Sequence, residues 1–395
     1  MKIKKVALLF LLLTFLSGTF TLNRLNLGVQ IEVRYIIFFM FILIYLLNGK
    51  KGDLKRGIIK KPLIFFLMTV CFYVFVSAIS LFYTVNPVLA TGKFMTLLFL
   101  VLLLLGTLFM AQSMRPSEFF NFTSIFFIII GAFYAMPVIA SVLSGASRGD
   151  VNLSGPNVTT RIFFFATCAS FYRYSLNKNN LYLTAVLFFL ASIILVGSRG
   201  GLVGAVFTIT LMLVIKILFA RKVKVNNTLT FRKLLLIPLC ITVIYFIYEP
   251  VKRVFMERFV GVTFDGDKVY TSGRDIIYFD AIEMIKEKPL FGHGIDSFTL
   301  STGHVYPHNL LLEMMVEIGL IGALIFIVFL LYSILFIFKL KKSPLFILSG
   351  FPLYMIIVQM FSGEFYDFRY FFLWSIPFLC YGAVDKSELM YLENE

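Results

Sequence analysis

Long apolar runs alternate with short polar connectors along almost the whole chain. A helix that crosses a bilayer needs about 20 mostly apolar residues, or slightly fewer where flanking side chains reach the interface. The pattern predicts about twelve such helices, at residues 6–22, 34–47, 62–83, 93–112, 119–143, 160–176, 181–197, 201–220, 234–249, 319–338, 345–361 and 369–384. The expected fold is therefore an all-α integral membrane protein, with residues 1–395 forming a single polytopic membrane domain.

The composition excludes a soluble fold. Hydrophobic residues make up 59% of the chain and charged residues only 14%, whereas a soluble domain has about 25% charged residues. The formal net charge is +15, which in a soluble protein suggests a nucleic-acid partner. Here the basic residues are concentrated in short connectors between apolar runs, which is typical of a membrane protein, so no nucleic acid is expected.

The positions of the basic residues predict the orientation of the chain. Lysine and arginine favour cytoplasmic loops, and with twelve spans all the basic connectors fall on one side. We therefore expect both termini to be cytoplasmic. The residues that carry this prediction are Lys2, Lys4, Lys5, Lys50, Lys51, Lys55, Arg56, Lys60, Lys61, Arg221, Lys222, Lys224, Arg232, Lys233, Lys339, Lys341 and Lys342.

One connector, residues 250–307, is exceptionally long and is expected on the outer side, between the ninth and tenth spans. Loops of this length are usually functional or disordered. This one carries helix signals, because Ser272 and Asp275 have the spacing of a capping box and Pro289 ends the run that follows. Between them lie apolar residues at amphipathic intervals, namely Ile276, Ile277, Phe279, Ile282 and Ile285. The loop is thus expected to be partly helical and to lie on the membrane.

Polar residues with no place in a cytoplasmic loop gather at the predicted outer boundary. They include Arg148, Asn157, Arg161 and Arg199, together with Arg274 in the long loop. A guanidinium group never deprotonates and presents a fork of donors that matches phosphate oxygens. The glycines around Arg199 predict a helix start there, and a helix N-terminus favours an anion. These arginines suit a pyrophosphate, although arginines that only reach the membrane interface would give the same pattern.

A histidine at the start of a long apolar helix is the second chemical feature. His308, followed by Asn309, is placed in the first turn of that helix, where it could act as a base or a donor. A polar residue at a helix start is the simpler interpretation. Glu317 lies nine residues further on, on the opposite helix face, and is interpreted either as structural or as a contact from another direction. The spans themselves are nearly uncharged, with Lys216 as an exception.

A metal site is not expected. His304 and His308 have the four-residue spacing of a zinc pair, but Pro307 between them argues against one continuous helix. The four cysteines lie inside apolar runs without CxxC spacing, so neither a metal cluster nor a disulfide framework is indicated.

Taken in order, the motifs resemble those of the O-antigen ligase and polymerase superfamily of bacterial membrane glycosyltransferases. The first motif is residues 197–204 (GSRGGLVG), and the second begins at Arg274 and includes residues 288–298 (KPLFGHGIDSF). The third is residues 308–322 (HNLLLEMMVEIGLIG), and residues 155–157 (GPN) resemble a looser element near Arg148. The resemblance covers residues 148–322, and His293 stands where the family more usually has a small or aliphatic residue.

The resemblance implies transfer of a glycan from an undecaprenyl-pyrophosphate donor on the outer face of the bacterial cytoplasmic membrane, without a metal or another cofactor. His308, Arg274 and Arg199 are the expected catalytic residues. The expected residues for binding the pyrophosphate or glycan are Arg148, Arg161, Asn157 and Asn309. The implied partners are the lipid-linked glycan and the bilayer, with a chain-length regulator and a flippase as further candidates.

Beside a polymerase, three other interpretations stay open: a ligase, a flippase and a structural scaffold. A polymerase would add the glycan to another lipid-linked repeat unit of a surface polysaccharide, whereas a ligase would move it onto a lipid core or another acceptor. We favour the polymerase because nothing in the sequence marks a different acceptor. A flippase should place polar groups near the bilayer midplane, and a structural scaffold would not need converging arginines.

Overall fold

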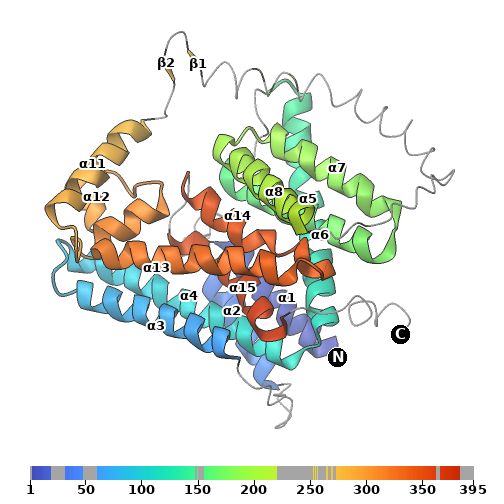
Figure 1. Cartoon of the computed structure of the whole chain (residues 1–395), viewed down its shortest axis with the longest axis horizontal. Coiled ribbons are helices and arrows are strands. Elements are labelled where there is room, and N and C mark those ends of the chain that lie inside the picture. Colours follow the sequence, from blue (N-terminus) through green and yellow to red (C-terminus); the bar gives the residue numbers. More distant parts are fainter. Residues whose placement is uncertain are drawn as a thin grey trace. The chain divides into compact units, whose positions relative to one another are not determined.

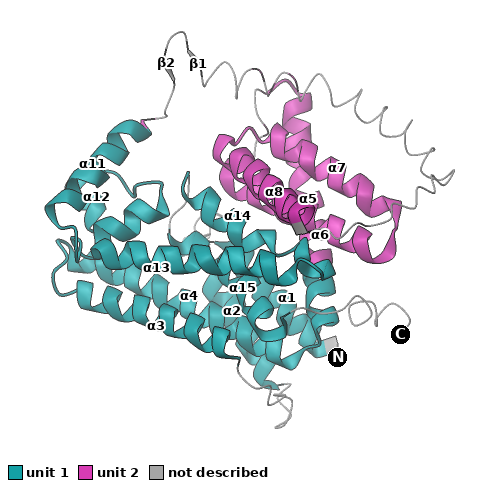
Figure 2. Cartoon of the chain, in the orientation of Figure 1, with its two compact units in different colours: residues 1–123, 274–395 teal, residues 124–273 magenta. Residues whose placement is uncertain are grey.

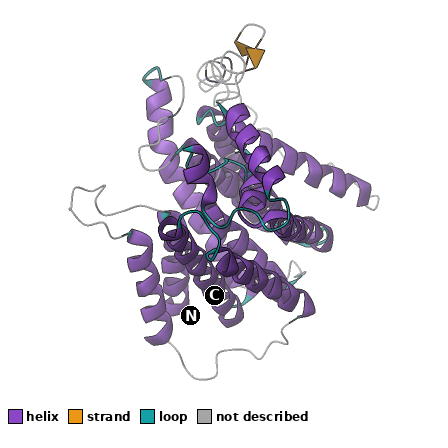
Figure 3. Ribbon diagram, turned by 90° about the vertical axis from the view of Figure 1, so that its left-hand side faces the viewer, coloured by secondary structure: helices purple, strands orange, loops and turns teal. Residues whose placement is uncertain are grey.

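The structure is a computed structural model that describes residues 2–18, 32–47, 60–146, 149, 155–219, 252, 254, 256, 264–265, 268–269, 273–361 and 365–382. The described part is helical (Figure 3), apart from two short antiparallel strands, β1 (Phe264–Asp265) and β2 (Lys268–Val269). The all-helical fold class is thus confirmed for these residues. The predicted ninth span, residues 234–249, lies outside them, as do Arg148 and Ser272.

In the described ranges, five helices are long and apolar enough to cross a membrane. Other described helices coincide with six further predicted spans, so the helices were located well but the count of twelve spans is not confirmed (Figure 1). The five are α3 (Lys61–Ser80), α4 (Pro87–Ser113), α5 (Pro116–Leu143), α8 (Arg199–Phe219) and α13 (Leu310–Leu340). The six are α1 (Lys2–Ser17), α2 (Val33–Leu47), α6 (Pro156–Asn177), α7 (Asn180–Leu195), α14 (Gly350–Gln359) and α15 (Arg369–Tyr381).

The starts of α4 and α13 differ from the prediction. Helix α4 begins at Pro87 and not at residue 93, because the Asn86 side-chain oxygen accepts the backbone N–H groups of Val88 and Leu89 at 3.1 and 3.2 Å. Asparagine before proline is a strong helix start. Helix α13 begins at Leu310 and not at residue 319, and Asn309 is its N-cap. Helix α13 therefore includes a first section with two charged side chains, Glu313 and Glu317, and Lys93 lies inside α4 and not at its start.

Helix α13 is broken at the residue where the span was predicted to begin. Gly319 has φ +62°, in the left-handed region, and its neighbour Ile318 is also non-helical. A Cβ atom on Gly319 would lie 2.4 Å from the carbonyl carbon and oxygen of Leu290. Only glycine fits this position, because it has both the required backbone conformation and the required closeness to another chain segment.

The chain divides into two compact units (Figure 2). Unit 1 comprises Met1–Thr123 and Arg274–Glu395 and includes α1–α4, α11 (Arg274–Glu287), α12 (Ser297–Thr302), α13, α14 and α15, with two short 3-10 helices, η3 (Pro344–Phe346) and η4 (Phe365–Phe368). Unit 2 comprises Ser124–Gly273 and includes α5 to α8. The prediction of a single membrane domain stays a prediction.

One end of unit 1 joins the α3–α4 connector to the segment before α12. The Thr84 hydroxyl donates to the Ile295 carbonyl at 2.7 Å, and the Ile295 N–H donates to the Ser80 hydroxyl at 3.1 Å. The Tyr83 hydroxyl donates to the Phe291 carbonyl at 2.8 Å. We call this the connector end of unit 1.

The opposite end of unit 1 gathers basic residues from separate connectors. Lys4 donates to the Ser113 carbonyl at the end of α4, and Lys60 donates to the Tyr381 carbonyl at the end of α15. The Tyr332 hydroxyl on the second half of α13 donates to the Pro62 carbonyl at 2.9 Å. This grouping agrees with the predicted placement of the basic connectors on one side, and which side of the membrane that is stays a prediction.

In unit 2 the central element is α6, which packs against α7 and α8. Ten consecutive residues, Thr160 to Ala169, are buried, so this helix is surrounded by protein and needs no lipid-facing apolar stripe. Gly131 on α5 permits a close approach, since a Cβ atom there would lie 2.6 Å from the Cβ of Ala166. Small residues at such contacts are a common way for membrane helices to pack.

The break in α13 gives a test of the fold. Substitution Gly319→Ala combines a left-handed backbone with a clash against Leu290, and we expect it to lower the free energy of unfolding by about 3 kcal/mol. Gly92→Ala on α4 is the matched control, because nothing lies within 4 Å of its Cβ position and alanine favours a helix by about 1 kcal/mol. Thermal unfolding in detergent measures both, and equal melting temperatures would contradict the described break.

Candidate functional site

Helix α11 carries Arg274 as its first residue, and it ends at Glu287, before Pro289, as the sequence predicts. Its inward face consists of Ile277, Ala281 and Met284, which pack with Phe298 and Val316. Three of the apolar residues in the predicted pattern, Ile276, Phe279 and Ile282, are instead exposed. The apolar pattern predicted the helix correctly. The apolar side chains of the helix lie on two faces, and one of these faces packs against α13.

The second and third sequence motifs form one structural unit in the backbone. The His293 N–H donates to the Val316 carbonyl at 2.7 Å, and the Gly294 N–H donates to the Glu317 carbonyl at 2.9 Å. Buried His293 contacts the Met284 carbonyl with its Nε2 at 2.7 Å. A carbonyl can only accept, so Nε2 carries a proton. His293 thus has a structural part at the end of α11.

His308 lies in the loop before α13 and not in its first turn, which corrects the predicted position. Its φ is +56°, and its ring is 4.4 Å from the ring of Tyr306 in an edge-on arrangement. Partial burial lowers the pKa of His308, and the positive charges of Arg274 and His304 lower that pKa further. Because these charges act on His308, Arg274 at the start of α11 and His304 in the loop both lie near the imidazole.

Asn309 is fixed by its role at the helix start. Its side-chain oxygen accepts the backbone N–H groups of Leu311 and Leu312 at 3.0 and 3.2 Å. This N-cap stabilises the start of α13 by about 1 kcal/mol. The cap also holds the residue that follows His308 directly.

Around His304 and His308, and elsewhere in the described ranges, no group of three or more His, Cys, Asp or Glu side chains could hold a metal ion. Pro307 lies in a loop between α12 and α13, as expected from the sequence, so the two histidines do not share a helix.

In unit 2 the first motif and the looser GPN element are in contact. Helix α8 begins at Arg199 as predicted, and the Ser198 hydroxyl donates to the Asn157 side-chain oxygen at 2.6 Å. The same hydroxyl accepts the Gly201 N–H at 3.2 Å. Helix α6 begins at Pro156, so two helix N-termini lie side by side, an arrangement that favours an anion.

Of the other two predicted site residues in unit 2, only Arg161 belongs to the described residues. Arg161 is on α6 and follows Thr160, whose methyl group lies against Gly201. Arg161 is only 1% exposed. Arg148 lies outside the described residues. The structure therefore brings Asn157 to the start of α8, places Arg161 in the interior just inside that end, and leaves Arg148 as a prediction.

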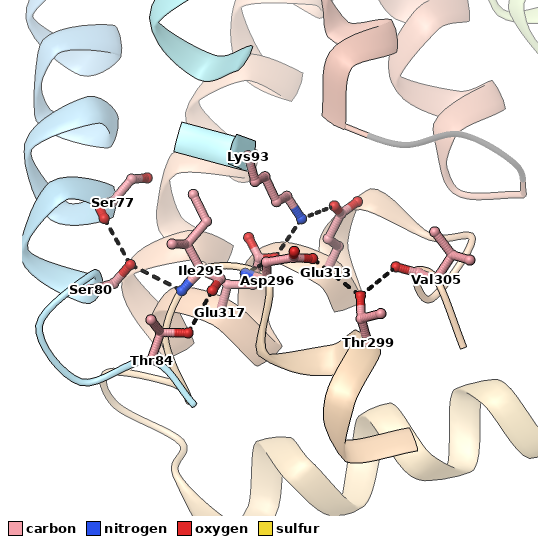
Figure 4. Close-up of polar contacts among 10 residues, drawn as sticks. All are labelled: Ser77, Ser80, Thr84, Lys93, Ile295, Asp296, Thr299, Val305, Glu313 and Glu317. Atoms are coloured by element: carbon pink, nitrogen blue, oxygen red, sulfur yellow. Dashed lines mark hydrogen bonds and ion pairs between the residues drawn. The ribbon is translucent and has the colours of Figure 1, made fainter. Parts of the chain in front are cut away.

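A buried charged cluster at the connector end of unit 1 was not anticipated (Figure 4). The Lys93 ammonium on α4 lies 2.5 Å from an oxygen of Glu313 and 2.5 Å from an oxygen of Glu317, both on α13. The side chains of Glu313 and Glu317 are 2% and 6% exposed. The Asp296 N–H donates to the same oxygen of Glu317 at 2.8 Å. Glu317 is thus structural, as predicted, but with partners on another helix.

The sequence held a signal for this cluster. Charged residues inside membrane helices are expensive and usually have a partner or a function. Glu313 and Glu317 are spaced four residues apart on α13, so they share a face. They were overlooked because the spans were drawn from residues 93 and 319 onwards, which placed all three charges at or beyond the predicted helix ends.

Comparison with known proteins supports the motif-based interpretation. A family model described as O-antigen ligase matches residues 184–327, a region that includes Arg199, Arg274, His308 and Asn309. No curated protein matches the chain. The match confirms the resemblance seen in the motifs: residues 184–327 of this multi-pass membrane protein are similar to the O-antigen ligase family.

Proposed function

We propose that this chain is a metal-independent glycosyltransferase that takes its glycan from an undecaprenyl-pyrophosphate donor on the outer face of the cytoplasmic membrane. The observation that carries the proposal is the match of residues 184–327 to the O-antigen ligase family. Within this region Arg274 lies near enough to His308 for its charge to lower the pKa of the imidazole. A chain-length regulator and a flippase fit as partners of such an enzyme.

The energy for transfer must come from the donor itself, because nucleotide sugars and ATP are not supplied outside the cytoplasmic membrane. A hydroxyl oxygen of the acceptor attacks the anomeric carbon of the donor glycan. The bond between that carbon and the phosphate oxygen breaks, and the lipid pyrophosphate leaves with the bonding electrons. The proton of the attacking hydroxyl goes to His308, which the lowered pKa keeps neutral and ready to accept it.

The arginines act where negative charge grows. Fixed cations stabilise the leaving pyrophosphate more strongly in the transition state than in the bound donor, which raises the rate of the chemical step. We assign Arg199 and Arg274 to the pyrophosphate, with Arg148 and Arg161 as further candidates. Asn157, held by Ser198, and Asn309 position the donor or the acceptor.

Among the possible activities we favour polymerisation of lipid-linked repeat units, as in O-antigen or capsule assembly, over ligation to a lipid core. A flippase is the more remote alternative. The buried cluster places charges inside α4 and α13, but Lys93 is the seventh residue of α4. That position is about 9 Å from the helix start and far from the middle of a 27-residue helix, so the cluster does not form the midplane site of a transporter.

Reconstitution with one lipid-pyrophosphate-linked repeat unit, a chelator and no other acceptor tests the activity. We expect a ladder of longer glycans on a gel, because the proposed chemistry needs only donor, acceptor and these side chains. Absence of a ladder would contradict polymerisation of that unit. Transfer to an added lipid core would then support the ligase, and movement of the lipid without transfer would support the flippase.

Variants test the assigned roles. We expect Arg199→Ala, Arg274→Ala and His308→Ala each to lower kcat by about 10² to 10³, since each removes a group that acts on the reacting atoms. Lys286→Ala is the matched control, because Lys286 is exposed on the same helix as Arg274 and forms an ion pair with Glu283 on that helix. Full activity in two of the three variants, with normal membrane insertion, would contradict the roles assigned to Arg199, Arg274 and His308.

The pH dependence tests His308 as the base. Because burial and two nearby cations lower the pKa of His308, the neutral form persists below the ordinary value of about 6.5. The acid limb of kcat/KM should therefore have its midpoint below pH 6.5, and activity should fall only as the pH drops through it. On the residual activity of Arg274→Gln the midpoint should move up towards 6.5. An acid limb with its midpoint above pH 6.5, or a midpoint that does not move in Arg274→Gln, would contradict this role.

A further inference from the structure

We propose that Glu317 and Thr299 are positioning residues that, through Asp296, fix the loop presenting His308. This inference rests on the proposed role of His308 in glycan transfer. The groups form one hydrogen-bonded chain from a membrane helix to the loop, and Figure 4 shows its members converging at the connector end of unit 1.

The chain starts at an anchored carboxylate. Glu317 is held by Lys93 and buried on α13, next to the break at Gly319. Its oxygen accepts the Asp296 N–H at 2.8 Å. A hydrogen bond to a buried carboxylate is stronger than a neutral one, so Glu317 fixes the backbone of Asp296 in the frame of the membrane helices.

Asp296 needs this support because of its backbone. Its φ is +57°, a conformation that costs a non-glycine residue about 1 kcal/mol or more. The residue before it is held as well, because Ile295 bonds to Ser80 and Thr84 at the α3–α4 connector. Asp296 is thus fixed from two sides, by α13 and by the connector.

Thr299 transmits this position to the loop. Its hydroxyl lies 3.1 Å from an Asp296 carboxylate oxygen and 3.0 Å from the Val305 carbonyl, so one proton is shared between the two acceptors. Val305 is three residues before His308, whose own φ is +56°. In the described part of unit 1, two non-glycine residues have a positive φ, Asp296 and His308. Asp296 precedes Thr299 in the chain, and His308 follows Val305.

Other contacts of the loop are local. His304 donates its N–H to the Thr302 hydroxyl at 3.2 Å, and the Tyr306 and His308 rings are in contact. Both contacts are within or directly next to the loop. The Thr299 hydroxyl joins the loop to Asp296 and so to Glu317. A displacement of about 1 Å at a reacting group can lower a rate by about 10², which makes this single hydroxyl important for a base on the loop.

Thr299→Val and Thr299→Ser form a matched pair. Valine has the same shape without the hydroxyl, and serine keeps the hydroxyl. We expect Thr299→Val to lower kcat about tenfold or more, with the donor KM within about twofold, and to speed amide exchange of residues 303–306. Thr299→Ser should keep both properties close to those of the parent protein, because the shared hydrogen bond survives.

Glu317→Gln and Glu317→Leu form a second matched pair, in which only glutamine keeps the hydrogen-bond acceptor. Both leave Lys93 paired with Glu313, so neither strands a buried lysine. Glutamine keeps an oxygen for the Asp296 N–H, and leucine does not. Glu317→Leu should therefore lower kcat and speed loop exchange, whereas Glu317→Gln should do neither.

Hydrogen exchange separates the two possible failures. If Thr299→Val and Thr299→Ser give equal exchange and equal kcat, or if the loop loosens in Thr299→Val without a fall in kcat, the positioning inference is overturned. If His308→Ala itself keeps full activity, the proposed function of His308 fails instead, and the exchange data still report whether Thr299 and Glu317 hold the loop.

Discussion

A helix broken inside a membrane leaves backbone groups that lipid cannot hydrogen-bond, and every such group must find a partner within the protein. In an unbroken α13, the Val316 carbonyl would accept from Leu320 and the Glu317 carbonyl from Ile321. Instead these carbonyls accept from His293 and Gly294, and the Leu320 N–H donates to the Pro289 carbonyl at 2.8 Å. The loop after α11 therefore replaces one turn of hydrogen bonds in α13. The positions of Glu317, Asp296 and finally His308 all depend on this exchange.

The same constraint explains which parts of the fold the sequence could predict. Helix α8 begins at Arg199 and α11 ends before Pro289, as expected, because both boundaries follow from glycine and proline, which act locally. The start of α13 was misplaced because hydropathy alone excludes a first section that contains Glu313 and Glu317. The start of α4 was misplaced because its first residues, 87–92, include Pro87, Thr91 and Gly92 and were taken as part of the connector. The caps Asn86 and Asn309 were local signals for the true starts. The pairing of Lys93 with Glu313 and Glu317 could not be predicted, since it joins residues more than two hundred positions apart.

The two groups of charges in unit 1 differ in what surrounds them. Lys93 lies between two carboxylates in a dry setting, where an isolated charge would be costly and a paired one is tolerated. Arg274 and His308 are only partly buried. The charges of Arg274 and His304 act on His308, whose ring contacts Tyr306. The buried cluster is satisfied by internal contacts and gives rigidity. In the proposed function, the positive charge of the partly buried group complements the pyrophosphate.

In the proposed reaction, which uses no metal, the cation and the base must still be firmly placed. A metal ion orders its ligands by coordination, and arginine and histidine have no such internal geometry. Their positions must come from the backbone that carries them. Here Arg274 begins a helix packed through Ile277 and Met284, and His308 follows a loop bonded through Thr299. Helix α11 packs against Val316, and the loop before His308 reaches Glu317 through Thr299 and Asp296, so both segments are attached to α13 next to its break. The break that costs α13 a turn of its own hydrogen bonds therefore also joins the proposed base and the proposed cation to one support.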